Sequence, residues 1–144
     1  MILLLQQHYN ELNGEFMRAA TVRGLICHSA KEAGLNVGPD YEYGWGLGNA
    51  ESAAEIISGK DVSTLLEENT LLNTQVFTKQ ITITSTQDIK ATICWTDPTG
   101  SANASGEIDN RTPRLKNNLD LKILKDGVST AIKWVNLNEI HQKN

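Results

Sequence analysis

Apolar residues follow two different periods along the chain, and the first of these is helical. From residue 2 to residue 33, apolar side chains recur at every third or fourth position, which is typical of a helix with one buried face. The Asn13-Gly14 pair interrupts the pattern, so we expect one helix before it and a second over residues 15–33. Gly34 is expected just past the end of the second helix. The first apolar stripe consists of Leu4, Leu5, His8, Tyr9 and Leu12.

A third helix is expected to begin after Asn49. The asparagine side chain is a good N-cap, because its oxygen accepts a hydrogen bond from a free backbone N–H of the first turn. Glu51 follows in that turn, where the helix dipole favours a negative charge. Small and apolar residues then recur at helical spacing, and Gly59 is expected to end the helix. These residues are Ala50, Ala53, Ala54 and Ile57.

From residue 75 the period changes to two, which predicts antiparallel strands. The strand-like segments are residues 75–86, 89–95, 119–127 and 130–137. The Asp126-Gly127 pair favours a tight hairpin between the last two. Because helices come first and strands follow, we expect an α+β chain. It would consist of a helical region at 1–58, a linker at 59–74 and a region of antiparallel strands at 75–144.

Composition narrows the possible functions. The chain has 144 residues and a formal net charge of −4, which argues against a nucleic-acid partner. Its two cysteines, Cys27 and Cys94, form no CxxC pair, so neither a zinc site nor a disulfide framework is indicated. A single disulfide between Cys27 and Cys94 remains an alternative. The short apolar start has no basic flank, which argues against a signal peptide, and no apolar run is long enough to span a membrane. A chain that begins inside a hydrophobic helix suggests a segment of a longer protein.

Glycines alternate with aromatic residues just before the third expected helix, in the stretch GPDYEYGWGLGNAESAAEI at residues 38–56. Aromatic side chains bury a large area, whereas glycine permits a left-handed or closely packed backbone. We therefore expect Trp45 to fill a gap in the core. Gly46 is expected to have a positive φ or to pack directly on a helix. The stretch is not a dinucleotide-binding motif, because no strand precedes it and the glycine spacing differs.

The order of these elements resembles the C-terminal end of the catalytic domain of subtilisin-like serine peptidases, the subtilases. In that family, a helix that ends near a Ser-Ala or Thr-Ala pair is followed by a glycine-aromatic-glycine segment and a final helix that begins Asp-Ala or Asn-Ala. The matching residues here are Ser29-Ala30, Gly44-Trp45-Gly46-Leu47, Asn49-Ala50 and Ala53-Ala54.

The second half resembles the β-sandwich that follows the catalytic domain in some subtilases and is related to the P domain of proprotein convertases. The matching stretches are Cys94-Trp95-Thr96-Asp97-Pro98 and Asn117-Asn118-Leu119-Asp120-Leu121. Asn118 stands where the family often has Asp. The resemblance implies a jelly-roll-like β-sandwich at 75–144, and an incomplete one, since about four or five strands are fewer than a complete sandwich contains. The two resemblances together cover residues 2–57 and 76–135.

The resemblance implies a secreted or cell-envelope serine endopeptidase as the parent protein, which would hydrolyse protein or peptide substrates with a Ser-His-Asp triad. The Gly-Thr-Ser motif of the nucleophile and the segments of the triad Asp and His are absent from this chain. We therefore expect no catalytic residue in it and a structural, stabilising role. Its implied partner is the missing N-terminal part of the peptidase domain. Without that part, exposed apolar helix surface and open strand edges favour self-association.

Three nucleophile-like groupings have simpler structural interpretations. Cys27 and His28 are neighbours on a helix and do not face each other, and the same holds for Ser29 and His28. His8 lies on the apolar stripe, where a packed histidine is the more common finding. A Ser-His-Asp triad could be composed from Asp40, His28 and Ser29 by residue type alone. A triad is recognised by its geometry, however, and the spacing of these residues does not favour one.

Asp97 and Asp120 are the candidate metal ligands. Oxygen ligands in loops suit calcium, and Asp109 lies in a nearby polar loop. The alternative is an Asp-Pro turn at Asp97 and a solvated strand face at Asp120, and no EF-hand spacing is present.

A second function class is a non-enzymatic β-sandwich that binds carbohydrate or serves in adhesion, with a helical cap. A cluster of exposed aromatic residues would favour it. Only Trp95 and Trp134 lie in the expected sandwich, and both fall at positions of the alternating pattern that are expected to be buried. A third possibility is an inactive, peptidase-like protein.

Overall fold

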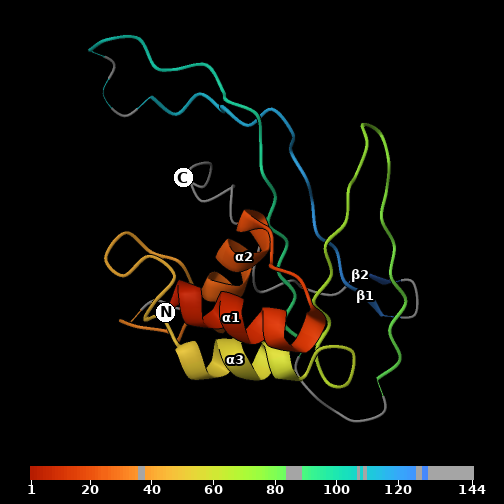
Figure 1. The fold of residues 1–144 in the computed structure, drawn as a ribbon. Coiled ribbons are helices and arrows are strands. Elements are labelled where there is room, and N and C mark those ends of the chain that lie inside the picture. The colour runs from red at the N-terminus through yellow and green to blue at the C-terminus, as the bar shows by residue number, and fades with distance from the viewer. Residues whose placement is uncertain (36–37, 84–88, 107, 109, 126–127, 130–144) are drawn as a thin grey trace.

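The computed structural model describes residues 1–35, 38–83, 89–106, 108, 110–125 and 128–129. Its helices are α1 (Ile2–Asn13), α2 (Ala19–Ser29) and α3 (Ala50–Ser58), and α3 packs against both of the others (Figure 1). After α3 the chain leaves this group and runs through long connections (Figure 1). In the part of the chain that the structure describes, no helix has the length and apolar character that crossing a membrane requires.

The hydrophobic core lies where the three helices meet. α1 follows the sequence pattern in part: Leu5 and Tyr9 of its stripe are buried, whereas Leu4 and Leu12 are exposed. Gly14 ends α1 with a left-handed φ of 76°, and its N–H donates to the carbonyl of Asn10 at 2.8 Å. The expected end of this helix is thereby confirmed. The buried hydrophobic residues among those described are Leu5, Tyr9, Met17, Val22, Leu25, Ala53 and Ile57.

α2 begins later than the spacing predicts, at Ala19 instead of residue 15. The reason is a pair of hydrogen bonds between Gln6 of α1 and the backbone of Met17. The Gln6 side chain accepts from the Met17 N–H and donates to the Met17 carbonyl, both at 2.8 Å. These bonds hold the connection against α1 and bury Met17, so the helix starts only after it.

The N-terminus of α2 is capped from a distant part of the chain. Its N-cap, Arg18, makes no side-chain cap bond. Instead Glu68 accepts from the Arg18 N–H at 2.7 Å, accepts from the Thr21 hydroxyl, and forms an ion pair with the Arg18 guanidinium at 3.1 Å. A carboxylate at this position satisfies a free N–H and interacts favourably with the helix dipole.

α2 also ends earlier than predicted, at Ser29 instead of residue 33. Lys31 leaves the helix and pairs with Leu47 through two backbone hydrogen bonds, each 2.8 Å long. Gly34 has a positive φ of 84°, but it is not the helix cap; the ring of Tyr43 lies against it. The glycine-aromatic stretch thus folds back onto the end of α2, which no periodicity in residues 15–33 indicates.

α3 agrees with its prediction at both ends. The Asn49 side chain accepts from the Ser52 N–H at 3.1 Å, and Glu51 lies in the first turn. Gly59 is the C-cap and donates its N–H to the Glu55 carbonyl at 2.8 Å. Ala53 and Ile57 point into the core with no more than 1% of their surface exposed.

In the second half, the structure describes one short hairpin. β1 (Leu124–Lys125) and β2 (Val128–Ser129) pair antiparallel, with Lys125 opposite Val128, so two residues connect them. This agrees with the hairpin expected at Asp126-Gly127, whose own placement lies outside the described residues.

The other expected strands form no ladder where the structure describes them. Residues 75–83 and 89–95 carry no strand, and apolar side chains of these segments are exposed. A strand is stable only when it pairs and buries one face. Residues 84–88 and the expected return strand 130–137 lie outside the described residues, so the β-sandwich and its boundaries stay predictions. The exposed apolar residues include Val76, Phe77, Ile81, Ile83 and Ile89.

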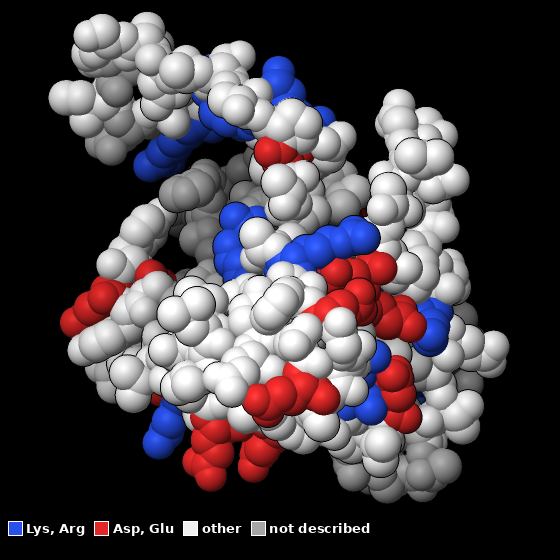
Figure 2. Space-filling view, in the orientation of Figure 1, with Lys and Arg blue, Asp and Glu red and all other residues white. Residues whose placement is uncertain are grey.

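The outer side of α1 is apolar and exposed. Leu3 is 84% exposed and Leu4 69% exposed, although both are apolar residues at the start of a helix. Figure 2 shows a largely uncharged area over this part of the molecule. Exposed apolar surface of this kind usually marks an interface.

Candidate functional site

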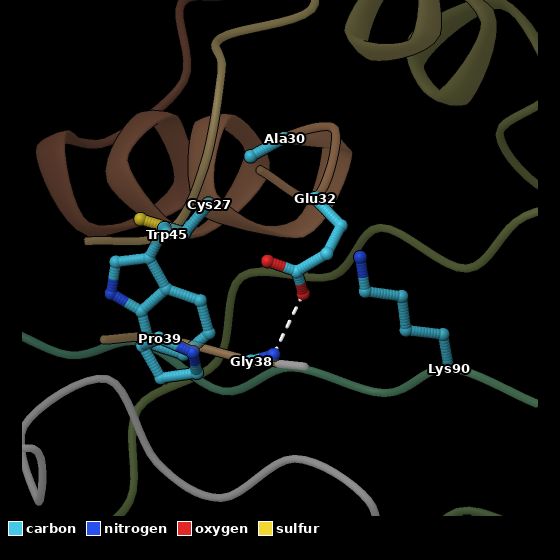
Figure 3. Close-up of a pocket in the computed structure, with 7 residues that line it drawn as sticks. All are labelled: Cys27, Ala30, Glu32, Gly38, Pro39, Trp45 and Lys90. Atoms are coloured by element: carbon cyan, nitrogen blue, oxygen red, sulfur yellow. Dashed lines mark hydrogen bonds between the residues drawn. The ribbon is translucent and has the colours of Figure 1, made fainter. Parts of the chain in front are cut away.

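A small open hollow lies beside the end of α2 and has a volume of about 110 Å³. Two separate parts of the chain line it with α2: the glycine-aromatic stretch and the segment that contains Lys90. Cys27, Trp45 and Pro39 gather on one side, and the charged ends of Glu32 and Lys90 lie on the other (Figure 3).

The glycine-aromatic stretch is held in place by backbone pairing at two points. Leu47 pairs with Lys31 next to α2, and Asp40 pairs with Gly44 within the stretch. The Asp40 carboxylate also accepts from the N–H groups of Glu42 and Tyr43, at 2.9 and 2.6 Å, which closes a tight turn. These contacts position Trp45, which is half-buried and lines the hollow together with Cys27. The expectation that it fills a gap in the core is therefore wrong.

The two charged residues of the hollow have partners on its walls. The Glu32 carboxylate accepts from the buried Gly38 N–H at 2.7 Å (Figure 3). The Lys90 ammonium donates to the His28 carbonyl at the end of α2. Partial burial lowers the pKa of Lys90, and the negative charge of Glu32 opposes that change. A cation at a helix C-terminus is in a favourable field, so this contact fastens the Lys90 segment to α2.

Cys27 is not an activated nucleophile. Its thiol is half-buried, and burial raises its pKa; nearby Cys94 raises the pKa further, while the positive charge of Arg23 lowers it. A raised pKa keeps the sulfur protonated near neutral pH, and only the thiolate attacks. His28 does not assist, because adjacent residues on a helix do not face each other. Its Nδ1 lies 2.8 Å from the Thr92 hydroxyl.

The environment of His28 predicts a pH dependence of stability. Burial lowers the pKa of His28 below its ordinary value of 6.5, and the positive charge of Lys90 lowers it further. The unfolded chain therefore binds a proton before the folded chain does, so acid favours unfolding. We expect the midpoint of thermal unfolding to be independent of pH above about pH 7 and to fall as the pH is lowered through about 6.5.

Thermal melts between about pH 7.5 and about pH 5.5 measure this effect. His28→Gln, which cannot be protonated, should flatten the dependence. Lys90→Met, which removes the charge and keeps the aliphatic chain, should weaken it. A wild-type midpoint that rises with acidity in this range contradicts the expectation.

The other triad-like residues have separate partners. The His8 ring lies 2.8 Å from the Ser58 hydroxyl of α3, so it connects α1 to α3. Ser29 is 6% exposed and its hydroxyl donates to the Ile26 carbonyl at 3.3 Å. Asp40 closes its own turn, as described above. The structure therefore does not assemble Asp40, His28 and Ser29 into a catalytic arrangement.

The two candidate metal ligands differ in their surroundings. Asp97 accepts from the N–H groups of Lys116 and Asn117, at 2.7 and 3.0 Å, and from the Asn117 side chain at 2.7 Å. Partial burial acts to raise the pKa of Asp97, but these hydrogen bonds outweigh it and lower the pKa. Asp120 is exposed. Asp97 thus joins the two stretches that resemble the subtilase sandwich.

Over the described residues, no three His, Cys, Asp or Glu side chains gather to hold a metal ion. Asp109 lies outside that part of the chain. Calcium binding by Asp97 and Asp120 therefore stays a prediction, and so does the rival binding-module function, because Trp134 also lies outside. Sequence reasoning missed the contributions of Glu32, Glu68 and Lys90, since each acts on a part of the chain that no local motif links to it.

The comparisons with known proteins give no relative for this arrangement. No protein-family model, no curated protein and no solved structure matches the chain.

Proposed function

We propose that the chain is the C-terminal part of the catalytic domain of a subtilisin-like serine endopeptidase, followed by part of a β-sandwich. The parent protein would be secreted or attached to the cell envelope. In it, this segment would support the nucleophile and close the domain, while the missing N-terminal part would carry the triad. The chain itself would perform no catalytic step.

The observation that carries this proposal is the connection from α2 to α3. Gly46 and Leu47 lie directly on the backbone of Lys31, and the chain then enters a helix capped by Asn49. The residues that carry the resemblance are therefore the residues on which this connection depends. A chance similarity in a surface loop would not require a glycine at this point.

The exposed apolar side of α1 supports the proposal independently. A helix that packs against a larger domain carries apolar residues on the side that the domain covers, and these are exposed when the domain is absent. In the parent enzyme, the parallel sheet of the missing part would cover Leu3 and Leu4. The same surface would promote self-association of the isolated chain.

The transcript that encodes the chain provides the direct test. We expect an in-frame Gly-Thr-Ser motif closely upstream of the Met1 codon, and Asp and His segments of the triad before it. The extended protein should be labelled by a serine-directed fluorophosphonate, and replacing the motif serine with alanine should abolish the labelling. An extended reading frame without these segments contradicts the proposal.

The 144-residue chain alone should neither cleave casein nor be labelled by the fluorophosphonate. The physical reason is that removing a triad member leaves only a small residual rate, and here the oxyanion hole is missing as well. Casein cleavage by the purified chain that the fluorophosphonate abolishes would mean that the active site lies within these residues.

A further inference from the structure

Residues 89–95 run along α2 in the opposite direction to the helix. Near the end of α2, Lys90 contacts the His28 carbonyl and Thr92 contacts the His28 ring. One and a half turns earlier, the Arg23 guanidinium donates to the Trp95 carbonyl at 2.8 Å. The segment is therefore anchored to the helix at both ends, and Cys94 lies between the anchors.

Cys94 sits on α2 because a glycine leaves room for it. A Cβ atom added at Gly24 would lie 3.1 Å from the Cβ of Cys94. The Cys94 sulfur also lies 3.1 Å from the Nε of Arg23, which donates to it. Cys94 therefore occupies the surface formed by Arg23 and Gly24.

Cys27 borders the same surface one turn further along. It follows Gly24 by three positions and Arg23 by four, and side chains at these separations are neighbours with Cβ atoms about 5–6 Å apart. Both thiols are free and half-buried. A disulfide requires Cβ atoms about 3.5–4.5 Å apart. Cys94 lies close enough to Cys27 to affect its thiol, and the missing side chain of Gly24 leaves room for Cys94 to move along α2 toward it.

We propose that Cys27 and Cys94 form an intramolecular disulfide when the chain is exposed to an oxidising thiol buffer. Oxidised glutathione is the electron acceptor in this exchange. A thiolate of one cysteine attacks it, one reduced glutathione leaves, and the second cysteine then displaces the other. The two cysteines are oxidised to one S–S bond, two reduced glutathiones are formed, and the two thiol protons leave with them.

This bond fastens the segment after the expected linker to the second helix. The loop that it closes runs from Cys27 to Cys94 and contains α3 and the expected linker, and long loops gain the most from such a link. The raised pKa of Cys27 slows exchange in both directions, which suits a structural bond better than a catalytic one. The inference uses only contacts within this chain and does not depend on the proposed peptidase origin.

The test compares the full chain in a strong reductant with the same chain equilibrated with oxidised glutathione at low protein concentration. Free thiols are then trapped with N-ethylmaleimide. We expect the oxidised chain to form no covalent dimer, to take up no maleimide, and to yield one linked peptide containing Cys27 and Cys94. Its thermal midpoint should rise by roughly 10 °C, as expected for closing a long loop in a chain of this size, and reduction should reverse the rise.

Cys27→Ser and Cys94→Ser serve as matched controls, and each should abolish both the linked peptide and the thermal shift. Glutathione attached separately to each cysteine, or covalent dimers in place of the internal link, would overturn the proposal. A linked peptide without any rise in the midpoint would overturn its stabilising role. If a variant does not fold, maleimide uptake and peptide mapping of the wild-type chain still decide the question.

Discussion

Gly46→Ala is expected to destabilise the chain by about 2–4 kcal/mol, through backbone strain and the loss of pairing next to α2. Gly46 has a φ of 95°, which L residues rarely adopt. A Cβ at this position would lie 2.3 Å from the carbonyl oxygen of Lys31, and that oxygen belongs to the backbone. The backbone segments at Lys31 and at Leu47 would have to separate, which weakens both hydrogen bonds between these two residues.

Gly44→Ala is the matched control for this change. Gly44 lies in the same stretch and also has a positive φ, 59°, but no atom lies within 4 Å of the added Cβ. It therefore isolates the backbone cost, about 1–2 kcal/mol. Urea unfolding of the two variants separates the contributions. Equal losses, or an unchanged midpoint for Gly46→Ala, would mean that the stretch does not pack closely on Lys31.

Ile57→Ala is expected to cost about 2–5 kcal/mol, the range for removing a large buried aliphatic side chain and leaving a cavity. Ile57 is 1% exposed and lies on α3, the helix that packs against both of the others. Since small domains have about 5–15 kcal/mol of total stability, this one change should remove a large share of it. Denaturant unfolding at several concentrations of urea measures the loss.

Leu3→Ala provides the comparison for Ile57. Leu3 is a residue of similar size on a helix, but it is 84% exposed. Its replacement should change the free energy of unfolding by no more than about 0.5 kcal/mol. If both changes cost the same, α1, α2 and α3 do not share the core described here.

Features set by neighbouring residues could be predicted from the sequence. Gly14 ends α1 because a left-handed residue can satisfy the last carbonyls of a helix, and this needs only local chain. Asn49 and Gly59 define α3 for similar reasons. The positive φ of Gly46 also agrees with the sequence, because glycine permits a left-handed backbone.

Features set by distant residues could not be predicted in this way. The spacing extends α2 to residue 33, but pairing with Leu47 ends it at Ser29. Apolar alternation over 75–83 is the pattern of a strand, yet alternation specifies only which face would be buried, not the strand that pairs with it. The hollow beside α2 depends on Lys90, which contacts the His28 carbonyl at the C-terminus of α2. No local sequence pattern predicts this contact. The hydrogen bonds that Asp97 accepts from Lys116 and Asn117 also join segments far apart in the sequence, so no local motif indicates them.

The position of Glu68 bears on how the chain can be divided. Composition places a linker at 59–74, and a linker is usually treated as dispensable when a protein is shortened. Glu68, however, supplies the acceptor for the Arg18 N–H and for the Thr21 hydroxyl at the start of α2. A truncation after residue 58 keeps α1, α2 and α3 but removes the carboxylate that accepts hydrogen bonds from the first turn of α2. The minimal unit that can fold with α2 intact therefore extends at least to Glu68, ten residues beyond the last residue of α3.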